Sequence, residues 1–353
     1  MNIPNITIAQ KTIGHTHRPF IIAEMSGNHN QSLERAMQIV EAAADAGADA
    51  IKLQTYTADT MTINARHGLF DIKDEASLWN GKNLYELYQI AYTPWEWHQP
   101  LFEHAKSRGL IAFSSPFDAT AVDFLEELEV PLYKVASFEN TDHPLLKKIA
   151  KTGKPVIMST GLTTAADIDE SVRVLRDNGC QELILLKCTS TYPATPDNSN
   201  LMTIPHMGQM FNCHVGLSDH TMGIGAPVAA VALGARVIEK HFTLRRSDGG
   251  VDSAFSLEPQ ELKALVIESE RAFRALGKVQ YGVMDAEQNS RRFKRSIYVV
   301  RDVAAGEAFT AENLRVIRPG DGLEPKYYEQ LLGTKSNKSI KAGTPLNMDI
   351  VIN

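Results

Sequence analysis

The segment FIIAEMSGNHNQSLERAMQIVEAAADAGADAIKLQ (20–54) decides the fold, because it contains one complete strand–helix–strand unit. An apolar run (20–24) predicts the first strand, and DAIKLQ (49–54) predicts the second. Between them, Ser32 is placed to cap a helix over 33–46. The apolar residues of this helix recur at helical spacing on one face: Leu33, Ala36, Met37, Val40 and Ala44. A helix between two strands indicates that the strands run parallel.

The same alternation continues to about residue 276 and predicts eight strands. Their expected runs are FIIAE (20–24), DAIKLQ (49–54), LIAFSS (110–115), LYKVAS (132–137), PVIMST (155–160), LILLKC (183–188), HVGLSD (214–219) and RVIEKH (236–241). Helical patterns follow most of them, and the last helix (259–276) begins at Pro259 and stops at Gly277. Eight units in about 260 residues indicate a closed (β/α)8, or TIM, barrel. No GxGxxG follows the first strand, which argues against a dinucleotide-binding fold.

Three regions depart from this alternation. The stretch 55–94 is too long for an ordinary loop, and we expect it to carry an extra helix near 83–91. The opening residues (4–18) resemble a hairpin that could close the bottom of the barrel. After Gly277 the sequence becomes polar, and then short strands and Gly turns predict a small β-rich module that docks on another surface. The expected division is a catalytic domain with the N-terminal hairpin (1–279), a linker (280–292) and the small module (293–353).

The composition limits the class of protein. The 353 residues are 43% hydrophobic and 22% charged, which is ordinary for a soluble globular protein. A net charge of −6 without a dense basic block argues against a nucleic-acid partner. The N-terminal residues lack the apolar core of a signal peptide, and no apolar run approaches the roughly 20 residues that span a bilayer, so we expect a cytoplasmic protein without membrane contact. Three cysteines in apolar contexts are predicted to be reduced packing residues: Cys180, Cys188 and Cys213.

Lysines and serines near strand ends are the first candidates for a site, since barrel enzymes carry their active sites at the C-terminal ends of the strands. Alternation along DAIKLQ places Lys52 and Gln54 in the barrel mouth, and Ile51 and Leu53 against the helices. Lys134 lies in the middle of LYKVAS, where a buried charge needs a partner or a ligand. Four strand ends add hydroxyls: Ser115, Ser137, Ser159 and Ser218. One serine alone could be a turn residue, but ammonium and hydroxyl groups together predict a phosphate site.

Two histidines indicate a metal site. His220 and His241 end the seventh and eighth strands, which as neighbours would lie about 4.8 Å apart. One imidazole alone could be structural, but two side by side predict a divalent ion. Glu24, at the end of the first strand, is a candidate third partner, proton shuttle or orienting residue. The Gly-rich RRSDGGVDSAF (245–255) follows the last strand, and its Asp252 could hold substrate or a metal-bound water, or form an Asx turn.

Nine motifs in this order resemble the sialic acid synthase family. They are IAEMSGNHN, IKLQTY, FSSPFD, YKVASFE, STGL, KCTSTYP, GLSDHT, EKHFT and IRPGDGL, and the resemblance covers essentially the whole chain. GLSDHT and EKHFT are the most specific of them. The resemblance implies a barrel followed by a C-terminal SAF (antifreeze-like) domain. It also implies a domain-swapped homodimer, in which each SAF domain covers the partner's active site.

The resemblance further implies a synthase that joins phosphoenolpyruvate to a sugar aldehyde with the help of a divalent ion: manganese, or else magnesium or cobalt. His220 and His241 would hold the ion, and Glu24 would take part in proton transfer. Phosphoenolpyruvate would be bound by Lys52, Ser115, Lys134, Ser137, Ser159 and Ser218. The sugar or the metal-bound water would be faced by Gln54, Glu139, Tyr192 and Asp252. Arg318, in the SAF motif RPGDG, would reach across to an acetamido group of the sugar.

Two departures from the family pattern bear on the sugar. Members that act on N-acetylmannosamine usually carry GPDH after the eighth strand and Asn in CTNxYP, whereas this chain has GGVDSAF and Ser190. With YTPWEWH (92–98), these differences resemble the branch that makes pseudaminic acid. That branch implies a transferase acting on 2,4-diacetamido-2,4,6-trideoxy-L-altrose, and N-acetylneuraminic or legionaminic acid synthases are the alternative.

Three other classes of protein stay open at this point. A class I aldolase would use Lys52 or Lys134 as a Schiff-base nucleophile, which borohydride would trap with substrate. A phosphoenolpyruvate aldolase of the simple sugar phosphates would accept erythrose or arabinose phosphates. A non-enzymatic binding or ice-interacting protein would depend on the SAF domain alone and would tolerate the loss of His220.

Overall fold

The computed structural model describes residues 3–75 and 78–352. The chain forms two compact units, Met1–Gly277 and Lys278–Asn353, and each is described by itself. Across the described residues, no helix is long and apolar enough to cross a membrane.

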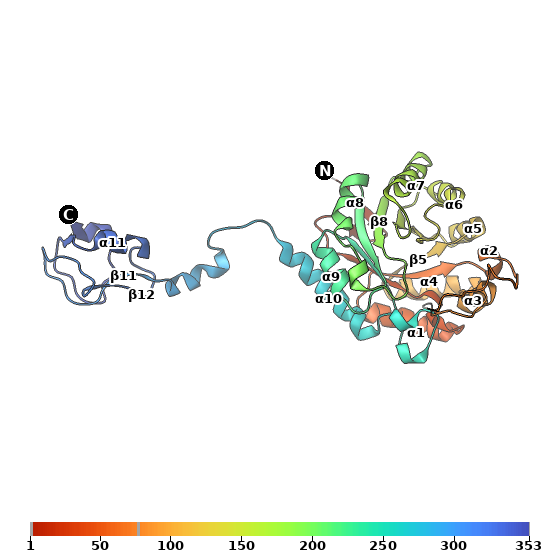
Figure 1. Ribbon diagram of the computed structural model, residues 1–353, viewed down its shortest axis with the longest axis horizontal. Helices are drawn as coiled ribbons and strands as arrows, with labels where there is room; N and C mark the ends of the chain where they lie inside the picture. The colour runs from red at the N-terminus through yellow and green to blue at the C-terminus, as the bar shows by residue number, and fades with distance from the viewer. Residues whose placement is uncertain (1–2, 76–77, 353) are drawn as a thin grey trace. The chain divides into compact units, whose positions relative to one another are not determined.

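The first unit is a closed barrel of eight parallel strands, which confirms the predicted fold class (Figure 1). Each strand pairs with its neighbours in chain order, and the last closes the ring on the first, with Val237 opposite Phe20 and His241 opposite Glu24. The strands are β3 (Phe20–Glu24), β4 (Ala50–Thr55), β5 (Ile111–Pro116), β6 (Tyr133–Val135), β7 (Val156–Ser159), β8 (Leu183–Cys188), β9 (His214–Asp219) and β10 (Val237–His241). All eight coincide with predicted runs to within two residues at either end.

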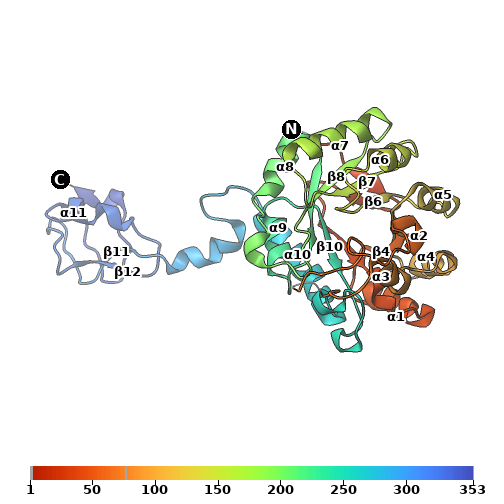
Figure 2. The same ribbon diagram turned by 45° about the vertical axis from the view of Figure 1, so that its right-hand side comes forward.

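Helices surround the barrel (Figure 2). They are α1 (Leu33–Asp45), α4 (His98–Ser107), α5 (Ala119–Glu127), α6 (His143–Ala150), α7 (Ala165–Asp177), α8 (Thr203–Phe211), α9 (Gly225–Ala232) and α10 (Pro259–Leu276). The Ser32 side chain accepts a hydrogen bond from the Arg35 amide, so the predicted cap of α1 is confirmed. Ile51 and Leu53 belong to the core between strands and helices, which leaves the other face of β4 to the barrel interior.

The bottom of the barrel is closed by an antiparallel hairpin, as predicted. Strands β1 (Ile6–Ile8) and β2 (Lys11–Ile13) pair with each other, and their isoleucines share a buried core with inward residues such as Phe113 and Ile157. The long stretch after β4 carries α2 (Ala58–Met61) and α3 (Leu84–Ala91), which confirms the predicted extra helix. Short 3-10 helices occur at Ser26–His29, Trp95–Trp97, Pro196–Asn198, Arg246–Asp248 and Ser253–Phe255.

The second unit is a small β-rich fold around its own core, which includes Ile297, Phe309 and Leu314. Its strands are β11 (Ser296–Val299), β12 (Leu314–Ile317), β13 (Lys335–Ser336) and β14 (Val351–Ile352), with helix α11 (Tyr328–Leu331) and 3-10 helices at Pro325–Tyr327 and Met348–Ile350. The segment expected to be a linker contains a further 3-10 helix, Asp285–Phe293, whose residues are all exposed.

Candidate active site

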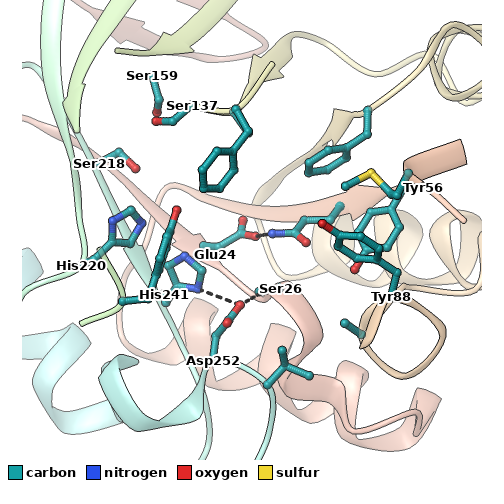
Figure 3. A pocket seen from close by; sticks show the side chains of 18 of the residues that line it. Glu24, Ser26, Tyr56, Tyr88, Ser137, Ser159, Ser218, His220, His241 and Asp252 are labelled. Carbon is teal, nitrogen blue, oxygen red and sulfur yellow. Dashed lines mark hydrogen bonds and ion pairs between the residues drawn. The ribbon is translucent and has the colours of Figure 1, made fainter. Parts of the chain in front are cut away.

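A cavity of about 270 Å³ opens at the C-terminal ends of the barrel strands. Strands β3, β4 and β6 to β10 each contribute a lining residue, and the insertion after β4 supplies another wall. Figure 3 shows the imidazoles of His220 and His241 on one side of this cavity, with Glu24 beside them and Tyr56 and Tyr88 on the other side. Polar and ionisable groups from distant parts of the chain therefore meet in one cavity.

Lys52 is buried in the floor of the cavity among carboxylates. Its Nζ lies 2.6 Å from Glu24 Oε2 and 4.0 Å from Glu239 Oε1, and it donates to Ser115 Oγ at 3.3 Å. The Gln54 amide donates to Glu24 Oε1 at 3.0 Å. Lys52 and Gln54 both line the cavity as expected, whereas Ser115 touches Lys52 without lining it.

Lys134 is the second buried lysine, and it shares Glu239 with the first. Its Nζ lies 3.9 Å from Glu239 Oε1 and donates to Ser159 Oγ at 2.7 Å and to the Val135 carbonyl at 2.9 Å. Glu239 also accepts from Ser218 Oγ at 3.2 Å. Two ammonium groups and three hydroxyls, those of Ser159, Ser218 and Ser137, therefore line one region of the cavity.

Glu239 was missing from the residues that the sequence singled out. It lies two positions before His241 on β10, so strand alternation puts both side chains on the inward face. The alternation of side chains along β10 could therefore have identified Glu239 from the sequence. Glu239 changes the charge of the site, because buried carboxylates partly neutralise the two lysines. The cluster is therefore not purely positive.

The ionisation of this cluster follows from burial and charge together. Burial raises the pKa of Glu24 to about 7, against the opposing effect of the Lys52 ammonium. Burial alone would lower the pKa of Lys52, but the carboxylates of Glu239 and Glu24 raise it. Burial also lowers the pKa of Lys134, and Glu239 counteracts that shift. The lysines outweigh burial at Glu239 and lower its pKa, whereas burial outweighs them at Glu24, so the two carboxyl groups are shifted in opposite directions.

The two histidines face each other with their ring centroids 5.2 Å apart. His220 Nδ1 lies 2.9 Å from the Thr189 carbonyl oxygen, which can only accept, so Nδ1 carries the proton and Nε2 keeps its lone pair. His241 Nδ1 lies 3.6 Å from Asp252 Oδ2. Burial, together with positive charge nearby that includes the Lys52 ammonium, holds the pKa of His241 well below its usual value, so this imidazole is neutral and able to act as a ligand.

Asp252 is held in the loop after β10 by a hydrogen bond from Ser26 Oγ (Figure 3). The loop reaches this position through Gly250, whose φ is +140° and whose hydrogens face Asn30 and Asn28; an added Cβ would lie 2.9 Å from Asn30 Oδ1. Gly250 thus lets the backbone of GGVDSAF approach the segment after β3. The result is a carboxylate beside His241, the pattern that fixes the tautomer of metal-binding histidines.

The residues present fit a divalent ion with few protein ligands. With Asp252 beside Nδ1 of His241 and the Thr189 carbonyl beside Nδ1 of His220, the Nε2 atoms of the two facing imidazoles are left as ligands. Within residues 3–75 and 78–352, no group of three or more His, Cys, Asp and Glu side chains is arranged to hold a metal. Glu24 is instead engaged with Lys52 and Gln54. An ion here would take two imidazoles and complete its coordination with water or substrate oxygens.

Cys188 was predicted to be a packing residue, and that interpretation is incomplete. All three cysteines are buried and free, as expected. Cys188, however, ends β8 on the inward face and lines the cavity. Burial alone would raise the pKa of its thiol, but hydrogen bonding with His220, Ser137 and Ser190 lowers it to about 7. Tyr192 covers the same corner, with its ring centroid 4.4 Å from that of His220.

Besides Ser115, two expected site residues do not line the cavity. Glu139 is half-buried after β6, its Oε2 has no hydrogen-bond partner among the described residues, and burial raises its pKa to about 7. Arg318 is exposed in the second unit, directly after β12. Their roles toward the sugar stay predictions.

The closed barrel with buried lysines, carboxylates and imidazoles at the C-terminal ends of its strands defines a (β/α)8-barrel enzyme. The chain belongs to the NeuB family, whose model matches residues 39–281, and a SAF domain matches residues 294–351.

Two pseudaminic acid synthases and one solved structure are similar to this chain over most of its length. A pseudaminic acid synthase of Campylobacter jejuni is 46% identical, over 93% of this chain and 95% of its own. A pseudaminic acid synthase of Helicobacter pylori is 43% identical, over 94% and 97% respectively. A solved structure of an N-acetylneuraminic acid (sialic acid) synthetase from Leptospira borgpetersenii has 32% identity and a TM-score of 0.73, covering 81% of this chain and 95% of its own.

Proposed function

We propose that this protein condenses phosphoenolpyruvate with 2,4-diacetamido-2,4,6-trideoxy-L-altrose and water to give pseudaminic acid and phosphate. The observation that carries the proposal is the placement of a lysine–serine cluster beside a facing pair of imidazoles in one cavity. The first group suits the oxygens of phosphoenolpyruvate, and the second suits an aldehyde that must be polarised.

The choice of sugar rests on the relatives and on two positions of this chain. The similar chains named above are pseudaminic acid synthases, and synthases of legionaminic acid and of N-acetylneuraminate phosphate are less similar. The GGVDSAF loop brings Asp252 to His241, and Ser190 lies 3.7 Å from Cys188 Sγ, so both departures from the N-acetylmannosamine pattern border the cavity.

In the proposed reaction, the lysines orient phosphoenolpyruvate. Lys52 and Lys134, with the hydroxyls of Ser137, Ser159 and Ser218, would bind its carboxylate and phosphate oxygens. Ser115 would support Lys52 from below, where it already accepts its hydrogen bond. This arrangement would hold the methylene carbon against the aldehyde in a reactive geometry. Because carboxylates raise the pKa of Lys52, it stays an ammonium, which disfavours a Schiff-base mechanism at this residue.

The sugar aldehyde would lie on the imidazole side. His220 and His241 would hold a divalent ion, manganese or else magnesium or cobalt, which when bound supplies Lewis-acid polarisation of the carbonyl. Asp252 would keep the His241 ring in position. Gln54, Tyr192 and, after a local movement, Glu139 would contact the sugar hydroxyls.

Proton transfer is assigned to Glu24. Attack by the methylene carbon opens the aldehyde C=O bond to an alkoxide and leaves positive charge at C2 of phosphoenolpyruvate. Water adds at C2 as Glu24 accepts one of its protons, and Glu24 returns a proton to the sugar oxygen. The tetrahedral carbon then collapses to the ketone by breaking its C–O bond, and the proton of its hydroxyl leaves with phosphate. Phosphoenolpyruvate labelled with ¹⁸O at the bridging position therefore tests the proposal: the label should leave in the phosphate. Label kept in the sugar acid would contradict C–O cleavage.

Replacing Glu24 with glutamine should lower kcat by about 10²-fold, because the base is lost while the shape is kept. The wild-type kcat/KM should rise with pH through about 7, since the pKa of Glu24 is raised to about 7 and the carboxylate form accepts the proton. The residual kcat/KM of Glu24→Gln should not show this rise with pH. If kcat/KM of Glu24→Gln still rose with pH, a group other than Glu24 would be responsible for the rise.

We further propose the domain-swapped homodimer, because the barrel mouth exposes apolar side chains that need a cover. They follow four successive strands: Phe138, Leu162, Met202 and Met222 are 59%, 74%, 70% and 51% exposed. The SAF domain of a second chain would cover them and bring its Arg318 to an acetamido group of the sugar.

Mixing two inactive variants tests this exchange. His241→Ala and Arg318→Ala chains, refolded together, should recover activity in mixed dimers, because one of the two composite sites is then intact. Each variant alone should stay inactive. A lack of recovery in mixed dimers, shown to form by native mass spectrometry, would mean that Arg318 acts within its own chain or not at all.

A further inference from the structure

Helix α3, in the insertion after β4, turns its apolar face to the cavity. Leu84, Leu87, Tyr88 and Ala91 recur at the i, i+3, i+4 and i+7 positions of one face, and all four line the cavity. An amphipathic helix ordinarily buries such a face against a core. Here the face borders an open space, so the wall opposite the imidazoles is apolar and can be covered by methyl groups of a ligand.

Two phenol hydroxyls interrupt this apolar wall. Tyr56 follows β4 and is 3% exposed, and its ring lies 5.7 Å from that of Tyr88 in an edge-on contact. Both residues line the cavity, so their phenol groups can reach a ligand that occupies it (Figure 3). Burial raises the pKa of both groups, so they remain neutral donors. Neutral phenol donors on an otherwise apolar wall match a ligand that carries a polar acceptor beside apolar groups.

The wall is fixed to the barrel rim by hydrogen bonds at several points. Gln31 Nε2 donates to the Ile90 and Tyr92 carbonyls at 3.1 and 2.6 Å. Trp95 Nε1 donates to the Tyr56 carbonyl at 3.2 Å, and Trp79 Nε1 donates to that of Val251 at 3.1 Å. The last bond joins the insertion to the loop that carries Asp252. Wall and imidazoles are therefore held at a set separation, with Glu24 between them (Figure 3).

We propose that Tyr56, Tyr88 and the apolar face of α3 form the subsite for the end of the sugar remote from its aldehyde. The phenols donate to the carbonyl of the acetamido group at C4, and Leu84 and Leu87 contact the methyl groups of C6 and of the acetamido group. This inference rests on the proposed function, because the imidazole pair sets the aldehyde end.

The subsite accounts for discrimination between sugars. N-acetylmannosamine has hydroxyls at C4 and C6, where the trideoxy sugar has an acetamido group and a methyl group. A C6 hydroxyl against Leu84 and Leu87 would lose its water without gaining a partner, and the phenols would lose the amide acceptor. The insertion after β4 is thus the specificity element, in addition to the GGVDSAF loop.

The variant Tyr88→Phe tests the subsite, with Tyr85→Phe as the matched control on the same helix. Tyr85 lies outside the cavity, and its hydroxyl donates to Asp59 Oδ1 at 3.0 Å. Losing one neutral hydrogen bond to the ligand should raise the KM for the diacetamido sugar by up to about 10-fold. The KM for phosphoenolpyruvate and kcat should change less than about twofold, because the lysine cluster is untouched. Tyr56→Phe/Tyr88→Phe should raise the sugar KM further, and Tyr85→Phe should behave as wild type.

Three outcomes would overturn the subsite. An unchanged sugar KM in the double variant would exclude the phenols as donors. An equal rise in both KM values would show a general disturbance of the cavity, and an equal effect of Tyr85→Phe would show a loss of helix packing. The proposed function is tested separately by the wild type in the same assay. Absence of wild-type turnover with the diacetamido sugar contradicts that function, and with it the subsite.

Discussion

Replacing Lys134 with methionine should both inactivate and destabilise the protein. Lys134 is 1% exposed, and its ammonium lies 3.9 Å from the Glu239 carboxylate and contacts Ser159. Removing it leaves a buried carboxylate with less compensation, which costs about 3–5 kcal/mol of the free energy of unfolding. Loss of its charged contacts to phosphoenolpyruvate should lower kcat/KM by about 10³-fold.

A double variant separates these two effects. Lys134→Met/Glu239→Gln removes both charges, so most of the lost stability should return in urea unfolding of the barrel unit. Activity should not return, because the phosphoenolpyruvate contacts are still missing. If the double variant were as unstable as the single one, the lost stability would come from packing and not from the unpaired carboxylate. A single variant with a wild-type KM for phosphoenolpyruvate would remove Lys134 from the binding site.

Replacing His220 with alanine should lower turnover by about 10³–10⁴-fold. This loss corresponds to several kcal/mol of transition-state stabilisation by the Lewis acid. The same change should abolish the binding of Mn²⁺ in a calorimetric titration, since one imidazole cannot replace two. EDTA should inactivate the wild type, and added Mn²⁺ should restore it.

The control for this variant is His206→Ala, an exposed histidine on α8 that does not line the cavity. It should keep both turnover and Mn²⁺ binding. If His220→Ala kept its turnover while still folded, the reaction would not depend on a metal held at this position.

Much of the barrel could be predicted because its signals are local. The alternation along β4 correctly predicted that Ile51 and Leu53 point outward and Lys52 points inward. Ser32 was correctly predicted to cap the start of α1. The closeness of His220 and His241 followed from strand order alone. Such features depend on spacing along the chain and on the closure rule of the barrel.

The parts of the site that the sequence left undetermined depend on contacts across the barrel. Glu239 lies between Lys52 and Lys134, and this is visible only once β4, β6 and β10 are assembled. The irregular turns after the short strand β6 keep Glu139 outside the cavity lining, and no periodicity describes such a segment. The wall formed by α3 depends on how the insertion folds back on the rim. Local pattern therefore predicted the side chains on regular strands and missed those set by tertiary packing.

Phosphate release from phosphoenolpyruvate, measured with each sugar in turn, tests the central claim most directly. The purified protein with Mn²⁺ should release phosphate with 2,4-diacetamido-2,4,6-trideoxy-L-altrose and form pseudaminic acid in equal amount. N-acetylmannosamine should support little or no release, because it lacks the C4 acetamido group and the C6 methyl group. Release with N-acetylmannosamine alone would contradict the account.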